Sequence, residues 1–273
     1  MKFTTIANAK KQTGLSYIGN INSSAKMIKN KKVNHEYTYI IYLAPAEISG
    51  YNVCSHSTPE CRMGCLATSG HAGMELQAGK KTIHDCRVKK TRLFYEQPEF
   101  FMAWVFAEIQ MFQRKAKKDG FGFSVRLNGT SDIDWANVLI NGKNIFELFP
   151  DVAFYDYTKN PNKFDNIAPN YHLTFSFSGM NWSNAKMLLQ RGFNIAVVFN
   201  VLKGTTLPAT FESYKVVNGD LSDFRIADAK GIIIGLKFKE IADRQMAYLL
   251  KAKSQFVVRT DDVRCNVQEL VYA

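Results

Sequence analysis

Hydrophobic and polar positions along this chain follow two periods, and the change from one to the other predicts a series of strands and helices. Short runs rich in β-branched and aromatic residues, bounded by turn residues, predict strands. They cover residues 37–43, 121–127, 152–155, 171–175, 194–199, 231–236 and 255–259. Stretches with apolar residues three or four apart predict helices. They cover residues 77–96, 99–118, 182–191 and 238–252.

The order of these elements indicates the fold class. After residue 120, strands alternate with helical patterns, which is typical of βαβ units and a parallel sheet. No strand is followed by the G-x-G-x-x-G turn of a dinucleotide-binding fold. The sequence therefore predicts an α/β protein built as a βα barrel or partial barrel. We expect one barrel-like domain over residues 37–273, preceded by a basic polar N-terminal arm at residues 1–36.

Polar side chains follow several of the predicted strands. In a βα barrel the residues after the strands share one rim, where the chemistry takes place. The candidates for binding a cofactor on this rim, after the second, third and fourth strands, are Asn128, Thr130, Ser131, Asp132, Lys159 and Ser176. Two of them have plainer alternatives, because Asp132 also suits a cap on the following helical turn and Lys159 also suits a solvated loop.

Three of the five cysteines fall within twelve residues, in the run Cys54-x6-Cys61-x3-Cys65. Thiolates gathered this closely usually hold a metal ion or an iron–sulfur cluster. Structural zinc sites pair ligands two to four residues apart, whereas the first gap here is six and no second tight pair exists. The spacing favours an iron–sulfur cluster in a loop after the first predicted strand. Zinc remains the alternative.

A fourth ligand would decide what such a cluster can do. Cys86 lies in a predicted helix and is typical of a buried core thiol. Cys265 follows the last predicted strand in a polar loop, and it is the candidate fourth ligand. Four thiolates close a 4Fe-4S cluster, which then serves structure, electron transfer or sensing. Three leave one iron open for a substrate or cofactor.

The charge of the chain adds a prediction about partners. The formal net charge is +11, and residues 1–32 contain seven lysines and no acid. Such an excess favours nucleic acid or another phosphate-rich partner, and a solvated surface is the alternative. The chain has neither an apolar signal core nor an apolar run long enough to span a membrane. We therefore expect a cytoplasmic protein with no membrane partner.

The motifs of the chain resemble those of the phage gene product 88 family. The cysteine loop carries the most specific part of the resemblance, in Ser49-Gly50-Tyr51-Asn52-Val53-Cys54 and Cys61-Arg62-Met63-Gly64-Cys65-Leu66. Further matches lie at residues 126–132, 154–159 and 173–176, so that the resemblance covers roughly residues 14–265. It implies an origin in a bacteriophage or prophage, and hence the cytoplasm of an infected bacterial cell, without implying an activity.

A weaker resemblance is to radical S-adenosylmethionine enzymes. They place three cysteines after the first strand of a partial βα barrel, and a polar turn after the second strand holds the methionine end of the cofactor. Residues 128–132 occupy that second position here, although the usual cysteine spacing, C-x3-C-x2-C, differs from this chain. We expect a phage iron–sulfur protein that acts on or binds nucleic acid. The alternatives are an enzyme of the radical S-adenosylmethionine type and a zinc-stabilised, non-catalytic binding module.

Overall fold

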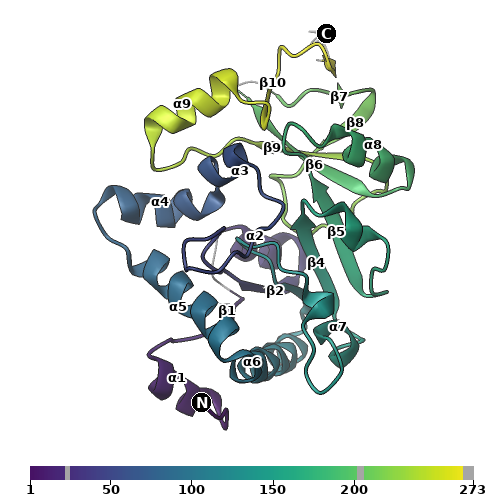
Figure 1. Cartoon of the computed structure of the whole chain (residues 1–273). Helices are drawn as coiled ribbons and strands as arrows, with labels where there is room; N and C mark the ends of the chain where they lie inside the picture. The colour runs from purple at the N-terminus through teal and green to yellow at the C-terminus, as the bar shows by residue number, and fades with distance from the viewer. Residues whose placement is uncertain (22–24, 202–205, 267–273) are drawn as a thin grey trace.

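The computed structural model describes residues 1–21, 25–201 and 206–266, and these form a mixed α/β structure around one sheet (Figure 1). The strands of these residues are β1 (Gly19–Asn20), β2 (Glu36–Ile41), β3 (Gly122–Arg126), β4 (Ala153–Thr158), β5 (Tyr171–Ser176), β6 (Asn194–Asn200), β7 (Thr210–Phe211), β8 (Tyr214–Asn218), β9 (Ile233–Lys237), β10 (Val257–Arg259) and β11 (Cys265–Asn266). The α-helices are α1 (Ile6–Thr13), α2 (Ala25–Asn34), α3 (Pro59–Met63), α4 (Gly70–Gln77), α5 (Thr82–Glu96), α6 (Pro98–Asp119), α7 (Ile145–Leu148), α8 (Trp182–Gln190) and α9 (Arg244–Lys253).

The middle of the sheet is parallel, and its strands lie side by side in sequence order. β2, β3, β4, β5, β6 and β9 form this parallel run, and β8 extends it beyond β9. β10 pairs in parallel with the carboxyl end of β6, while β1, β7 and β11 add antiparallel pairs. The path through the described strands runs from β1 to β11 without returning to its start. The predicted α/β class is thus confirmed, whereas closure into a barrel is not.

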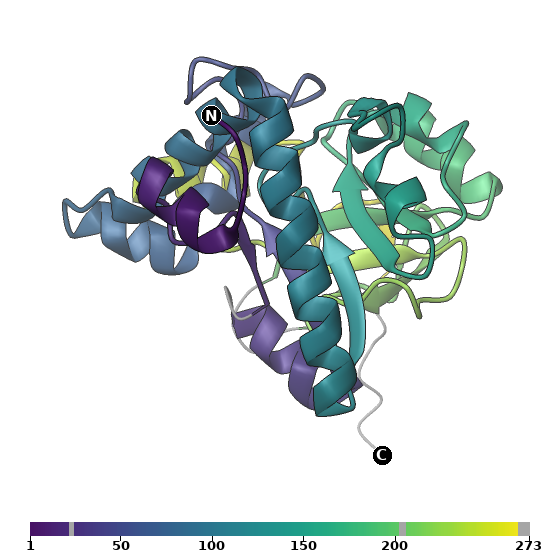
Figure 2. The same ribbon diagram turned by 90° about the horizontal axis from the view of Figure 1, so that it is seen from below.

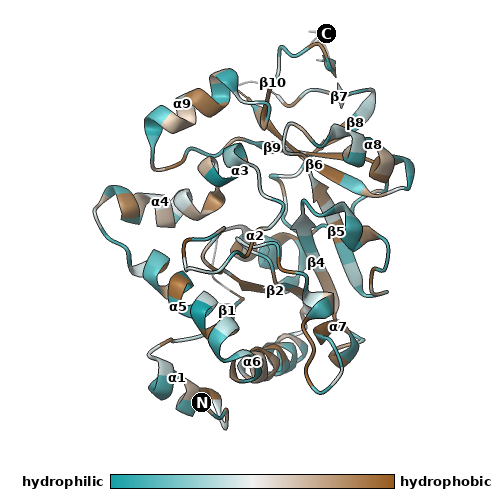
Figure 3. Ribbon diagram, in the orientation of Figure 1, coloured by the Kyte–Doolittle hydropathy of each residue, from teal (hydrophilic) through white to brown (hydrophobic). Residues whose placement is uncertain are grey.

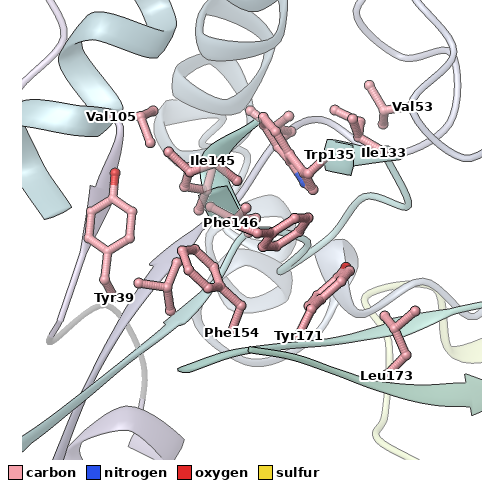
Figure 4. Close-up of a cluster of buried hydrophobic side chains, with 14 of the residues drawn as sticks. Tyr39, Val53, Val105, Ile133, Trp135, Ile145, Phe146, Phe154, Tyr171 and Leu173 are labelled. Atoms are coloured by element: carbon pink, nitrogen blue, oxygen red, sulfur yellow. The ribbon is translucent and has the colours of Figure 1, made fainter. Parts of the chain in front are cut away.

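Helices cover the outside of this sheet. α6 packs on β2 and β3, α8 on β5 and β6, and α9 on β10, and Figure 1 shows α4, α5 and α9 on the side of the molecule away from α7 and α8. Strands inside a parallel sheet are usually buried on both faces and rich in hydrophobic residues. This holds best for β6 and β9, whose middle residues are brown in Figure 3, whereas β4 and β5 mix polar and hydrophobic residues. Part of the core is aromatic: the ring centroid of Phe146 lies 5.0 Å from that of Phe154 and 4.3 Å from that of Tyr171 (Figure 4).

The described part of residues 1–36, the segment expected as a polar arm, packs against the rest of the structure. Leu15 and Ile18 are buried in the same hydrophobic core as the strands, and β1 pairs with β2. The buried carboxylate of Glu108 on α6 accepts hydrogen bonds from the backbone N–H groups of Ile18 and Gly19. This contact ties the segment to the long helix α6, on which α1 packs (Figure 2). Of the described helices, none is both long and apolar enough to cross a bilayer.

Candidate functional site

A cavity of about 1060 Å³ lies at the carboxyl ends of the parallel strands. Its wall includes residues at or directly after the ends of β2, β3, β4, β5 and β9, namely Tyr42, Arg126, Tyr157, Ser176 and Leu236. Ligand cavities in proteins commonly measure about 300–1,000 Å³. This one therefore has room for a cofactor together with a small substrate.

The structure brings most of the sequence-predicted site residues to this cavity. The polar strand-end residues that line it are Asn128, Thr130, Ser131, Asp132, Lys159 and Ser176. Cys54, Cys61 and Cys65 line it as well. Cys265 is not among its described lining residues. The rule that the ends of parallel strands share one edge of a sheet thus holds for the polar turns and for the clustered cysteines.

Local structure sets the positions of the clustered cysteines. The Thr58 hydroxyl accepts a hydrogen bond from the Cys61 N–H, and Pro59 begins the short helix α3, a combination that favours a helix start. Cys61 lies in α3, whereas Cys65 lies two residues beyond the end of α3, directly before the short 3-10 helix Leu66–Thr68. The Cys54 Sγ lies 4.0 Å from the Thr130 carbonyl oxygen, which joins the cysteine loop to the turn after β3.

Burial and the neighbouring thiols raise the pKa of Cys54 and Cys65, whereas the cations Lys159 and Arg87 act in the opposite direction on Cys65. Burial raises the pKa of Cys54 to about 11 and also raises the pKa of Cys65. Cys61 adds to both shifts, and Cys65 adds to the shift of Cys54. Burial lowers the pKa of the Lys159 ammonium, but Cys61 and Asp132 outweigh it, so that the pKa is raised overall. The Cys54 thiol therefore keeps its proton at neutral pH unless a cation replaces it.

The three thiols share the cavity wall without forming a ready site for one ion. Among the described residues, no three His, Cys, Asp or Glu side chains are gathered closely enough to hold a metal ion. Tetrahedral zinc with Zn–S bonds of about 2.3 Å needs its sulfurs about 4 Å apart. The arrangement does not match that requirement as it stands.

The turn after β3 is held by its own side chains. The Asn128 Oδ1 accepts hydrogen bonds from the Ser131 hydroxyl at 2.8 Å, the Ile133 N–H at 2.9 Å and the Trp135 indole N–H at 3.1 Å. The Thr130 hydroxyl donates to the Leu43 carbonyl at 2.5 Å. The side chains of Asn128, Thr130 and Ser131 thus hold the shape of the turn. A ligand in the cavity would therefore meet mainly the backbone groups of this turn.

Asp132 links the turn after β3 to the end of β4. Its carboxylate lies 2.7 Å from the Lys163 ammonium and accepts a hydrogen bond from the Lys159 N–H at 2.9 Å. The next helical turn, Trp135–Asn137, has Asp134 at its N-cap position and no side-chain cap. The alternative of Asp132 as a helix cap is therefore wrong, because a buried cation competes for the carboxylate.

Arg126, at the end of β3, pairs with acids rather than standing free. Its NH1 lies 2.7 Å from the Asp223 carboxylate, and its Nε lies 4.0 Å from that of Asp156. The Arg126 Nε and the Tyr157 hydroxyl are buried without a hydrogen-bond partner in the part of the chain that the structure describes. Both groups belong to residues of the cavity wall, so the wall holds polar groups that its own side chains leave unsatisfied.

The remaining two cysteines occupy different places. Cys265 lies in β11, its Sγ is 3.6 Å from the Arg259 carbonyl oxygen, and burial raises the pKa of its thiol to about 11. Cys86 lies on α5 and packs, partly buried, against the hydrophobic core, as its position in a helix predicted, and it also lines the cavity. The structure thus gives Cys86, and not Cys265, a position on the same wall as the clustered cysteines.

Sequence reasoning missed the basic wall that α5 contributes. The α5 cations that line the cavity, counting the residue directly before its first turn, are Lys81, Arg87, Lys89 and Lys90. The signal was present in the sequence as a concentration of bases, but only Lys90 among them is buried, at 4% exposure. Which lysine of a basic run is buried depends on the elements that pack over the helix, and the sequence of the run does not predict these.

Comparison with known proteins gives one match. The family model described as gene product 88 matches residues 5–260. No curated protein and no solved structure matches the chain. The match includes the cysteine loop, the turn after β3 and α5, so that the cavity as a whole lies within the matched residues.

Proposed function

Because the chain belongs to the gene product 88 family, whose name states no activity, we propose a function from the site itself: an iron–sulfur protein with its cluster on Cys54, Cys61 and Cys65 beside a substrate cavity. One observation carries this proposal, namely that three half-buried cysteines and the polar turn after β3 line a single large cavity. Buried thiols bind metals as thiolates, because the metal takes the place of the proton.

The donor set supports a multi-iron cluster over one zinc ion. A cluster binds each thiolate through a different iron and so accepts sulfurs that are spread over a wall, whereas zinc draws all of its ligands to one point. The three thiols interact electrostatically but do not form a single-ion site among the described residues. We therefore favour iron and sulfide over zinc.

Ligand number supports a reactive cluster rather than a closed one. Cys265 does not line the cavity in the described structure, which favours three protein ligands over four. A four-iron cluster on three thiolates keeps one iron free to bind a cofactor or substrate and to supply it with an electron. Cys86 is the remaining candidate for a fourth thiolate, because it lies on the cavity wall.

Positive side chains of the chain itself suit this role. Lys159 interacts with Cys61, and both Lys159 and Arg87 act on Cys65. Neighbouring cations favour thiolates over thiols, and they offset the negative charge of a thiolate-bound cluster. Lys159 is thus a positioning residue in the proposal. Its charge would tune the cluster rather than ligate it.

S-adenosylmethionine is the cofactor that we propose for the open iron. The turn at residues 128–132 lines the same cavity as the cysteines, and the Thr130 carbonyl lies beside Cys54. A cofactor bound to the free iron would therefore meet backbone groups of this turn. Incubation of the reduced protein with S-adenosylmethionine should release 5′-deoxyadenosine and methionine; an intact cluster that releases neither would remove the cofactor from the proposal.

The test of the cluster is iron and sulfide analysis of anaerobically purified protein with its visible spectrum. We expect a brown protein, and we expect Cys54→Ser, Cys61→Ser and Cys65→Ser each to lose most of the iron while Cys265→Ser keeps it. A Cys86→Ser variant with an altered spectrum would add Cys86 as a ligand. Colourless protein with stoichiometric zinc would instead support the zinc-stabilised binding module.

Nucleic-acid binding is a second candidate, favoured by two basic segments that meet in space. The Lys31 ammonium on α2 lies 4.8 Å from the centroid of the Tyr37 ring, and that of Lys115 on α6 lies 5.8 Å from the same centroid. The exposed lysines on these two helices are Lys29, Lys32, Lys115, Lys117 and Lys118. We define these five residues and Lys31 as the α2–α6 basic patch, which suits a phosphate backbone.

The salt dependence of binding tests this patch. We expect the affinity for a DNA or RNA oligonucleotide to fall steeply with salt, and Lys29→Gln with Lys32→Gln to reduce the slope by about two, one for each lost phosphate contact. A double variant at exposed lysines elsewhere, Lys143→Gln with Lys253→Gln, is the charge-matched control. Equal effects of the two pairs, or a flat response to salt, would mean that the charge of +11 is only a solvated surface.

A further inference from the structure

Lys90 is a buried cation for which the described residues supply no acidic partner within bonding distance. Its side chain is 4% exposed and lines the cavity. Its ammonium lies 4.2 Å from the centroid of the Tyr17 ring, and Cys86 and Glu108 are near enough to act on its charge. Burial of an ammonium group costs folding free energy, and a cation–π contact offsets only part of that cost. A group kept at such a cost suggests a ligand.

Glu108 does not supply the missing partner. It is near enough to Lys90 to act on its charge, but its carboxylate accepts hydrogen bonds from the Ile18 and Gly19 N–H groups and from the Tyr39 hydroxyl, at 3.1, 2.9 and 2.8 Å. It is thus used to hold β1. Burial lowers the pKa of Lys90 to about 8, so the ammonium remains mostly charged at neutral pH.

Arg87 places a second set of donors on the same wall. It lies three residues before Lys90 on α5, hence on the same face of the helix. Among the described residues its guanidinium makes one hydrogen bond, from Nη1 to the Ala67 carbonyl at 3.1 Å, although a guanidinium carries five N–H donors in a planar fork. The Arg87 Cζ atom also lies 5.2 Å from the centroid of the Tyr42 ring. Donors therefore remain for an acceptor inside the cavity.

We infer that this wall of the cavity is a binding site for the phosphate group of a small substrate, with Lys90 as the buried cation that contacts it and Arg87 as the second donor. A phosphate carries about −1.5 to −2 charges at pH 7 and three acceptor oxygens, which matches two converging cations with spare donors. Exposed Lys81 and Lys89 border the same wall. The inference goes beyond the proposed function and does not depend on a cluster being present.

Calorimetric titration of the full-length, anaerobically purified protein tests this site, with inorganic phosphate, inorganic pyrophosphate and ATP as probes and citrate as a carboxylate control. We expect pyrophosphate or ATP to bind more tightly than about 1 mM and citrate to bind more weakly. Lys90→Met should weaken this binding roughly tenfold or more, because it removes a charged hydrogen bond. Lys143→Met, which removes an equal charge from an exposed position outside the cavity and the α2–α6 basic patch, should change it less than about twofold.

Thermal unfolding separates a binding role from a structural one. Lys90→Met should melt at the same or a higher temperature than wild type, because it removes a buried charge, and Lys90→Arg should retain binding. Equal weakening by the two Met variants, citrate binding as tight as pyrophosphate binding, or no binding of any phosphate probe would each overturn the inference. Colourless protein that still binds pyrophosphate would remove only the iron–sulfur proposal, and brown protein that binds no probe would remove only this one.

Discussion

At the scale of single residues, Asp156 shows how burial decides chemistry in this fold. Its carboxylate is 1% exposed and accepts hydrogen bonds from the Asn128 N–H at 2.8 Å and the Tyr171 hydroxyl at 3.1 Å. Burial raises its pKa to about 7, although Arg126 acts in the opposite direction. The folded state therefore holds a proton on this carboxyl between about pH 4 and pH 7 that the unfolded chain has lost.

Asp156→Asn should change how stability depends on pH. A raised pKa in the folded state gives stability that is present below about pH 4 and is lost as the pH rises through about 7. The amide carries no charge, so the variant should gain on wild type over this range by up to about 4 kcal/mol in free energy of unfolding. Urea unfolding of both proteins at pH 4, 5.5 and 7.5 measures this gain; a constant difference would contradict it.

At the scale of elements, α3 packs tightly against α9 and the segment between α9 and β10, which are distant from it in sequence. A Cβ atom on Gly64, at the end of α3, would lie 3.1 Å from the Phe256 ring and 3.2 Å from a Leu250 methyl group. Leu250 belongs to α9 and Phe256 directly precedes β10. The end of the helix that carries Cys61 thus packs against α9 and the residue before β10, and position 64 has room for little more than a glycine.

Phe256→Ala should therefore loosen the cysteine loop as well as the core. Loss of a buried Phe side chain costs about 3–5 kcal/mol of stability, and we expect lower iron content because α3 loses its support. Phe149→Ala is the matched control, since Phe149 is similarly buried but packs on Phe106 of α6. Iron per protein after desalting, measured beside the melting temperature, distinguishes the two. Equal iron content in both variants would contradict the proposal that Phe256 supports the cluster by packing against α3.

The elements that the sequence predicted are those with long or strongly apolar patterns. All seven predicted strands are present within a few residues, as β2, β3, β4, β5, β6, β9 and β10. The four predicted helices are α5, α6, α8 and α9, but α5 and α9 begin later than predicted, at Thr82 and Arg244. The pattern missed α1, α2, α3, α4 and α7 and the short strands β1, β7, β8 and β11. Short helices are marginal alone and form because tertiary packing and caps hold them, so their periodicity is weak.

At the scale of the whole molecule, the order of the parallel strands creates the cavity. β2, β3 and β4 are consecutive neighbours in the sheet, so the loop after β2 and the turns after β3 and β4 meet at one edge. The Asp132 N–H donates to the Val53 carbonyl at 2.7 Å, and Asp132 in turn holds Lys159. Three segments of chain are thereby joined around the proposed cluster.

Removal of the proposed cluster should consequently destabilise the whole fold. A cluster that binds the folded protein and not the unfolded chain adds stability by mass action, by about 4 kcal/mol at 1,000 times its dissociation constant. Chelation of iron should lower the melting temperature of wild type and of Cys265→Ser alike, and should leave Cys61→Ser unchanged. Scanning calorimetry before and after chelation measures the difference, and an identical melting temperature for loaded and stripped wild type would exclude such a stabilising cluster.

The sequence by itself determined the α/β class, the family, the three clustered cysteines and the polar strand ends, because periodicity and spacing are local properties. Only the tertiary structure decided how those groups are used. It gave the Asn128 side chain to the turn, the Asp132 carboxylate to Lys163, and the cavity wall to Cys86 rather than Cys265. It also buried Lys90 against Tyr17. The Asn128 contacts are local, within the turn itself, but the ion pair of Asp132 and the burial of Lys90 depend on partners far along the chain, which no local pattern specifies.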